Sequence, residues 1–171
     1  MWGHIGDFRY EAQMVAGLDA WQFSRDQWIK PGTTKPFEFE TANKYGFSAR
    51  IDNYTIPGLR LGVSGYYGQS MHNAVPHDME TGKNKNIKGN IYLGAFDFTY
   101  NAHNWVARGN ADYGYVSDAK TISAIRKPGT QYVKPYESNQ VFGSHAIATS
   151  IEVGYDIFSP VSYTHLTLPT T

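Results

Sequence analysis

Charged side chains that could bind ions occur at alternate positions of the chain, between residues that are mostly apolar or small. Nine of them form the candidate set: Arg9, Glu11, Arg50, Asp52, Arg60, Asp97, Arg108, Asp112 and Glu152. Guanidinium groups bind anions, and carboxylates bind cations. Burying this set in a dry interior would cost several kcal/mol per ion. We therefore expect all nine to lie on one face that meets water, where they would line a path for ions.

The chain contains none of the short motifs that mark many enzymes, such as HExxH, G-x-S-x-G or the P-loop. It has no cysteine, which excludes disulfides and thiolate metal sites. The strongest metal candidate is a hydrophilic stretch that contains His72, His77, Asp78 and Glu80. A plain solvated loop explains these four residues more simply. The sequence therefore predicts no catalytic residue, no cofactor and no metal.

The composition excludes several classes of partner and of membrane segment. The 15 basic and 15 acidic residues give a formal net charge of zero, whereas nucleic-acid-binding proteins usually carry a basic excess. No apolar run reaches the ~18 residues of a membrane helix. The first residues, MWGHIGDFRY, lack the basic and apolar regions of a secretory signal. Such a start fits a cytoplasmic protein, and it fits a fragment of a longer chain equally well.

Six segments alternate apolar and polar residues with a period of two, which predicts β-strands. They span about 7–17, 43–53, 59–69, 90–101, 105–117 and 144–158. Several are near the ~9–11 residues of a tilted transmembrane strand. Long connections (18–41, 70–88, 118–143) alternate with short ones (54–58, 101–104), as they do in outer-membrane barrels. The predicted fold is all-β, an antiparallel transmembrane β-barrel segment of about six strands.

Pairing the strands across the two short turns predicts which side chains meet. In the first hairpin Asp52 falls opposite Arg60, and in the second Asp97 falls opposite Arg108. Both registers also place an aromatic ring over a glycine on the other face. Such cross-strand pairs stabilise a sheet by roughly 0.2–1 kcal/mol each. Because two independent hairpins give the same arrangement, we expect charge to meet charge along the polar face.

Tyrosine and tryptophan gather toward the two ends of the apolar face, with small and aliphatic residues between them. The residues near the short turns are Tyr10, Tyr54, Tyr100, Trp105 and Tyr155. Those near the long connections are Tyr45, Tyr67, Tyr92, Tyr113 and Tyr115. Aromatic residues are enriched in strands generally, but two belts that flank an apolar band are typical of a lipid-facing wall. We therefore expect the apolar face to contact membrane lipid.

The stretches FEFETANKYGFSARIDNYTIPGLRLGVSGYYG (37–68) and SIEVGYDIFSP (150–160) resemble outer-membrane porins related to the phosphate-selective porins of Gram-negative bacteria. The likeness extends over about residues 6–160 and is a match of pattern, without a short diagnostic motif. It implies a trimeric barrel of about sixteen strands that passes small anions. Pore-facing arginines at Arg9, Arg50, Arg60 and Arg108 would match those that hold phosphate. The chain departs from that family by placing at least six carboxylates on the same face, which argues against phosphate specificity.

These patterns predict a passive pore in the bacterial outer membrane for small hydrophilic solutes or ions, with anions such as phosphate among the candidates. An alternative hypothesis is a barrel whose long external connections bind a partner, with Trp21, Phe23 and Trp28 as contacts. A barrel enzyme is a third hypothesis. The connection 18–41 is expected to fold back on the barrel mouth, because its aromatic cluster is costly to leave in water.

The chain is also expected to be incomplete as a barrel. Six strands cannot close, since known single-chain barrels begin at eight. Residues 1–158 are therefore predicted to be part of a larger barrel. Residues 159–171 lose the alternation and look like a non-native, adapter-derived tail.

Overall fold

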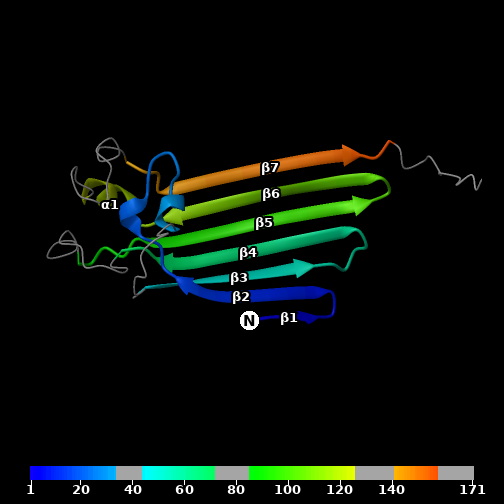
Figure 1. Cartoon of the computed structure of the whole chain (residues 1–171), viewed down its shortest axis with the longest axis horizontal. Coiled ribbons are helices and arrows are strands. Elements are labelled where there is room, and N and C mark those ends of the chain that lie inside the picture. Colours follow the sequence, from blue (N-terminus) through cyan, green and yellow to red (C-terminus); the bar gives the residue numbers. More distant parts are fainter. Residues whose placement is uncertain (34–43, 72–84, 126–140, 158–171) are drawn as a thin grey trace, which may run out of the picture.

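One antiparallel sheet of seven strands dominates the computed structural model, which describes residues 1–33, 44–71, 85–125 and 141–157 (Figure 1). The strands are β1 (Trp2–Ile5), β2 (Phe8–Ala16), β3 (Tyr45–Asn53), β4 (Leu59–Gln69), β5 (Asn90–Ala102), β6 (Trp105–Val116) and β7 (His145–Tyr155). Each strand pairs with its neighbours in the chain, so the sheet is a meander. Among the described residues, β1 and β7 have one neighbour each and form its open edges.

The short helices are η1 (Ala20–Gln22), η2 (Lys30–Thr33) and α1 (Ala119–Ile125). They gather at one end of the sheet, here called the loop end (Figure 1). The opposite end, the turn end, carries the tight connections β1–β2, β3–β4 and β5–β6. No helix within the described residues has the length and apolar composition needed to cross a bilayer.

The prediction of an all-β antiparallel fold is confirmed, and all six predicted strands are present. The predicted number of about six strands is one short of the seven observed, because β1 was not predicted. This strand has only four residues and joins β2 through a tight turn at Gly6, whose φ is 57°. Glycine adopts such a backbone without strain. A four-residue strand is too short for alternation to identify. The predicted tail 159–171 lies outside the described residues.

Both predicted hairpin registers are wrong by two residues. Asp52 pairs with Gly62 rather than Arg60, and Asp97 pairs with Asn110 rather than Arg108. In the second hairpin the turn is two residues long, since His103 and Asn104 both have positive φ, at 52° and 64°. Two positive φ values are the signature of a turn that matches the twist of a hairpin. A shift of two residues leaves every side chain on its predicted face, because side chains alternate with a period of two.

The two faces of the sheet differ as the alternation predicts. Ile51, Val63 and Phe96 lie side by side on the apolar face of β3, β4 and β5. These three side chains are 54, 59 and 45 % exposed, so this face is not packed against a core. The polar face lies on the other side and carries the nine candidate residues.

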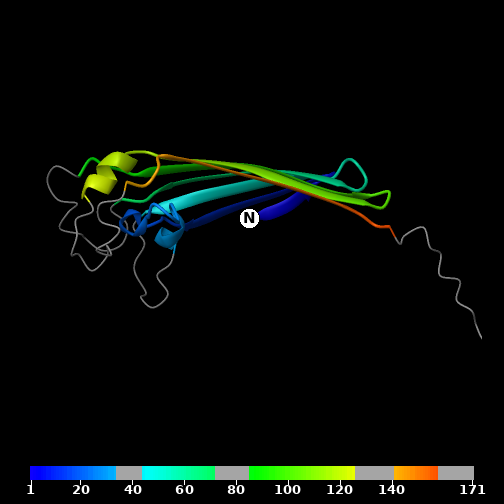
Figure 2. The same ribbon diagram turned by 90° about the horizontal axis from the view of Figure 1, so that it is seen from above.

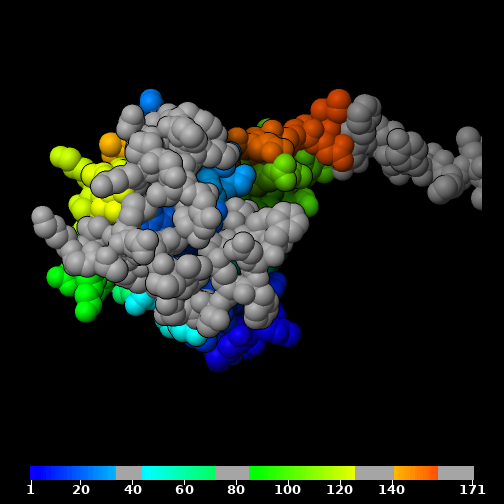
Figure 3. Space-filling view, turned by 60° about the vertical axis from the view of Figure 1, so that its left-hand side comes forward, coloured from blue at the N-terminus to red at the C-terminus, as the bar shows by residue number. Residues whose placement is uncertain are grey.

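The buried core lies at the loop end rather than along the sheet. Its members are Ala20, Trp21, Phe23, Met71, Ile91, Val116, Ala119, Ile122 and Phe142. The rings of Phe23 and Phe142 meet edge to face at 5.5 Å. Residues 18–33, here called the loop segment, fold back over one side of the sheet (Figure 2). Figure 3, which brings this end forward, shows blue atoms of the segment against the green and orange strands.

This packing agrees with the prediction that the first long connection folds back, as far as residue 33. The amide of Ala20 donates a hydrogen bond to the Ser70 carbonyl at 3.0 Å. The Asp19 carboxylate accepts from the amide of Trp21 at 3.0 Å and caps η1. The remainder of that connection, residues 34–41, lies outside the described residues.

Candidate functional site

The strand register arranges the side chains of the polar face in rows that cross the sheet. Counting from the turn end, the first row is Arg60, Thr99, Arg108 and Glu152. The second row is Arg9, Asp52, Gly62, Asp97, Asn110 and Ser150. The third row is Glu11, Arg50, Ser64, Ala95, Asp112 and Ala148, and the fourth is Gln13, Ser48, Tyr66, Leu93, Gly114 and Ala146. All nine residues predicted to line a pore lie in the first three rows.

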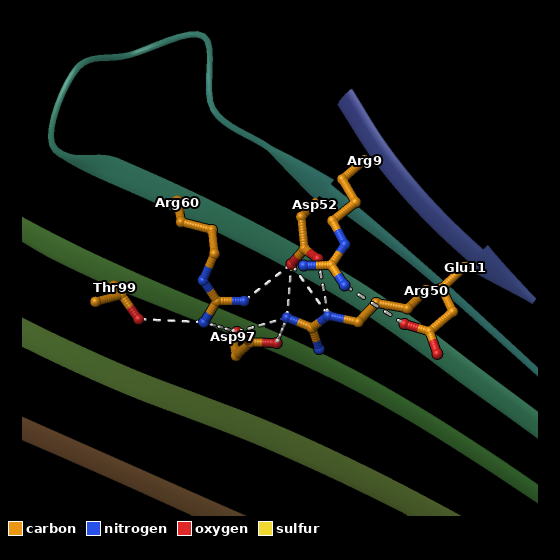
Figure 4. A network of polar contacts seen from close by, with 7 residues as sticks. All are labelled: Arg9, Glu11, Arg50, Asp52, Arg60, Asp97 and Thr99. Carbon is orange, nitrogen blue, oxygen red and sulfur yellow. Dashed lines mark hydrogen bonds and ion pairs between the residues drawn. The ribbon is translucent and has the colours of Figure 1, made fainter. Parts of the chain in front are cut away.

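Four of the nine form a closed ring of ion pairs, here called the charge cluster (Figure 4). Arg50 Nη2 lies 2.7 Å from Asp52 Oδ1 and 2.9 Å from Asp97 Oδ1. Arg60 Nη1 lies 2.9 Å from Asp52 Oδ1, and Arg60 Nη2 lies 2.6 Å from Asp97 Oδ2. Arg60 also donates to the Thr99 hydroxyl at 3.1 Å. Two positive and two negative charges leave the cluster neutral.

Gly62 provides the space at the centre of the charge cluster. A Cβ built on Gly62 would lie 2.7 Å from Asp97 Oδ1 and 2.9 Å from Asp52 Oδ1, and it would overlap the Arg50 guanidinium. Arg50 therefore crosses β4 above Gly62 to reach Asp97 on β5. On the same face, Gly46 and Gly68 leave room for the ring of Tyr66.

The predicted charge pairs are half right. Asp52 and Arg60 do form an ion pair, although they are not opposite each other in the register. Asp97 does not pair with Arg108, because Arg50 and Arg60 occupy its carboxylate. Arg108 instead meets Glu152 of β7, with Nη2 and Oε2 2.7 Å apart. These two side chains are 64 and 66 % exposed, so their pair is weak in stability terms.

The two remaining acids of the set have weaker partners. Arg9 Nη2 and Glu11 Oε2 are 4.0 Å apart, and Glu11 also accepts a hydrogen bond from the side-chain amide of Gln13. Asp112 accepts from Asn110 Nδ2 at 2.6 Å. No lysine or arginine among the described residues forms an ion pair with Asp112. The third row therefore retains negative charge that the charge cluster does not cancel.

A groove of about 560 Å³ runs along the third and fourth rows beneath the loop segment. Trp28 of that segment covers β6 at Gly114, where its ring occupies the place of a side chain. The Trp28 indole N–H donates to the Gly143 carbonyl at 2.8 Å. The turn that presents the ring is held by the Ser24 amide, which donates to the Trp28 carbonyl at 2.9 Å. On one side of the groove lie the charged residues of the third row. On the other side, over β5, β6 and β7, lie apolar residues of the fourth row.

Sequence reasoning missed the apolar part of this groove. Tyr66 and Leu93 occupy polar-face positions by simple alternation, but only charged and polar residues were selected for that face. Trp28 was expected to contact an external partner together with Trp21 and Phe23. Trp21 and Phe23 are 1 and 0 % exposed and belong to the core, so these two side chains are not available for such a contact.

Other candidate sites in the sequence gain no support from the geometry. The stretch with His72, His77, Asp78 and Glu80 lies outside the described residues. Within the described ranges, no three His, Cys, Asp or Glu side chains come close enough to hold a metal ion.

The polar face therefore carries a neutral charge cluster near the turn end and a groove toward the loop end. It holds charged groups of both signs, a small set of hydroxyl and amide groups, and one indole ring brought from the loop segment. Comparisons of the chain with protein-family models, with curated proteins and with solved structures give no match.

Proposed function

We propose that this sheet is a section of the wall of a bacterial outer-membrane β-barrel that serves as a passive pore. Its apolar face would contact lipid, and its polar face would line a water-filled lumen for small hydrophilic solutes or ions. The observation that carries the proposal is the orientation of the two faces. Exposed apolar side chains cover one whole face, while the charged rows and the loop segment share the other.

The aromatic residues of the apolar face support a membrane setting. The rings of Tyr67, Tyr92, Tyr115 and His145 form one row, with neighbouring centroids 5.1, 6.1 and 4.9 Å apart. Trp105 and Tyr155 meet at the turn end with centroids 4.8 Å apart. Tyr115 lies ten positions after Trp105 on β6, which is about 34 Å along a strand. With the usual strand tilt this becomes about 25 Å, the height of the apolar band of outer-membrane barrels.

Such a wall requires further strands to complete it. An open strand edge in lipid leaves unpaired backbone groups, each of which costs several kcal/mol. The open edges of β1 and β7 would therefore pair with additional strands. The likeness to phosphate-selective porins adds the proposals of about sixteen strands, a trimer and small anions as solutes. The neutral charge cluster favours weak rather than strict anion selectivity.

The proposal is tested by reconstituting the complete protein in planar bilayers and recording single-channel currents in potassium chloride. We expect stepwise ohmic conductance without a chemical energy source. Swelling of liposomes in small sugars would show passage of uncharged solutes as well. A correctly folded, membrane-inserted protein that gives neither current nor swelling would contradict a pore.

A further inference from the structure

The groove on the polar face has an asymmetric lining that selects for one kind of ligand. Over β5, β6 and β7 its fourth-row wall is apolar, with Leu93 and Ala146 near Trp28, whereas over β2, β3 and β4 the same row presents Gln13, Ser48 and Tyr66. Its third-row wall carries the carboxylates of Glu11 and Asp112, in one row across the sheet. A volume of about 560 Å³ is within the range of sites for small organic molecules.

The charge of the groove is negative once the existing ion pairs are counted. Arg50 contributes a cation to the lining, but Asp52 and Asp97 of the second row already contact it at 2.7 and 2.9 Å. Glu11 has its nearest cation at 4.0 Å, on the half-exposed side chain of Arg9. Asp112 accepts a hydrogen bond from the side-chain amide of Asn110 and forms no ion pair with any described lysine or arginine. An anion would therefore meet two carboxylates and one arginine that is already neutralised.

The indole ring of Trp28 and the carboxylate of Asp112 line the same part of the groove. Trp28 covers Gly114, and Asp112 is two residues earlier on the same strand and face, so about 7 Å separates their positions. The indole N–H is engaged by Gly143, which leaves ring carbons as the surface that faces the groove. Aromatic faces attract organic cations, and a carboxylate nearby adds a charge-assisted contact to the same cation.

We propose that this groove binds an organic ammonium ion with an apolar body about the size of one ring. The ammonium group pairs with Asp112 and contacts the Trp28 ring, and the apolar body lies along Leu93, Ala146 and Ala148. Hydrated metal ions fit poorly, because the walls beside Asp112 cannot replace their water. This inference rests on the proposed function, because it places the groove in the lumen of the pore. It names organic ammonium ions as the solutes that this part of the lumen binds.

Binding is measured by isothermal titration calorimetry on the complete protein in a non-ionic detergent. The probe is benzyltrimethylammonium, and the comparison compounds are tetramethylammonium, benzyl alcohol and benzenesulfonate. We expect benzyltrimethylammonium to bind most tightly, the two half-probes to bind at least several-fold more weakly, and the sulfonate not to bind. Equal binding of the charged probe and benzyl alcohol, or preferred binding of the sulfonate, would overturn the proposal.

Three variants locate the site. Asp112→Asn keeps the shape of the side chain and should weaken binding about tenfold to a hundredfold, the range expected for loss of a charge-assisted contact. Trp28→Leu keeps apolar cover over Gly114 and should weaken it about threefold to thirtyfold. Ala95→Lys places a cation at the register partner of Asp112 and should abolish binding. The matched control is Asp7→Asn, which removes an exposed carboxylate in the β1–β2 turn outside the groove and should leave binding unchanged.

Binding and conductance measurements together distinguish a failure of the groove proposal from a failure of the pore proposal. Ohmic conductance with no preference for the ammonium probe overturns the groove proposal and leaves the pore intact. Selective binding that depends on Asp112 and Trp28, in a protein without conductance, supports the groove and contradicts the pore. If Asp112→Asn fails to fold, as judged by its circular dichroism, Ala95→Lys decides the role of the carboxylate.

Discussion

The guanidinium of Arg50 occupies the space that a side chain at position 62 would fill, so Arg50 and Gly62 together make the charge cluster possible. From this position Arg50 reaches Asp52 on its own strand and Asp97 two strands away. The charge cluster therefore ties β3, β4 and β5 together across the polar face. The charge cluster therefore requires both the four charged side chains and the lack of a side chain at Gly62.

Gly62→Ala should disrupt the charge cluster. The new methyl group would force Arg50 and both carboxylates to move, and overpacking of this kind costs about 1–3 kcal/mol in the free energy of unfolding. The measurement is urea unfolding from lipid vesicles. The control is Gly94→Ala, because a Cβ on Gly94 meets nothing within 4 Å. An equal effect of the two substitutions would show that the space at position 62 does not matter.

Val63 and Ser64 are neighbours on opposite faces of β4, and they provide a test of which face meets lipid. Arginine in place of Val63 should destabilise the membrane-inserted protein by about 2–4 kcal/mol, since the position lies near the middle of the apolar band. Arginine in place of Ser64 should cost about 0–1 kcal/mol, because that side chain would face water in the proposed pore. Comparable losses at both positions, measured by unfolding from vesicles, would reverse or remove the face assignment.

The charge cluster should also control ion selectivity. Replacing Asp52 and Asp97 together by asparagine removes both carboxylate partners of Arg50 and Arg60 and would expose two positive charges to the proposed lumen. The reversal potential in a salt gradient should then shift toward anions, from a nearly unselective starting value. Ser150→Ala, in the same row and without a charge, is the control. A native pore that is strongly anion-selective and insensitive to the double substitution would refute this role.

Two tryptophans distinguish a packed loop segment from a segment that binds a partner. Trp21 is 1 % exposed and belongs to the core, whereas Trp2 is 72 % exposed. Trp21→Ala should lower the free energy of unfolding by about 3–5 kcal/mol, while Trp2→Ala should change it by about 0.5 kcal/mol or less. Thermal or urea unfolding measures both. Full stability of Trp21→Ala would revive the hypothesis that this segment contacts an external partner.

Local alternation was sufficient to predict six of the seven strands and the face on which each of their side chains lies. Arg50 and Asp52 lie on one face and Ile51 on the other, because successive side chains in any strand point to opposite sides. This relationship needs no knowledge of the neighbouring strand, so it survived an error of two residues in both hairpin registers. The strand β1 was missed because four residues are too few to show a period.

The pairing of charges, in contrast, was decided by the tertiary structure. The two-residue turn at His103 and Asn104 has positive φ values at residues other than glycine, which the residue types alone did not indicate. That turn sets the register of β5 against β6, and the register together with the empty space at Gly62 decides that Asp97 meets Arg50 and Arg60 rather than Arg108.

The groove depended even more strongly on the tertiary fold. Trp28 and Gly143 are 115 positions apart in the chain, yet the indole of one donates a hydrogen bond to the carbonyl of the other. Alternation predicts the face of each side chain because it depends only on adjacent residues. The partner of Trp28, in contrast, depends on how the loop segment packs its aromatic residues against the sheet. Contacts between distant parts of the chain arise from the packing of all elements at once, and no local pattern records them.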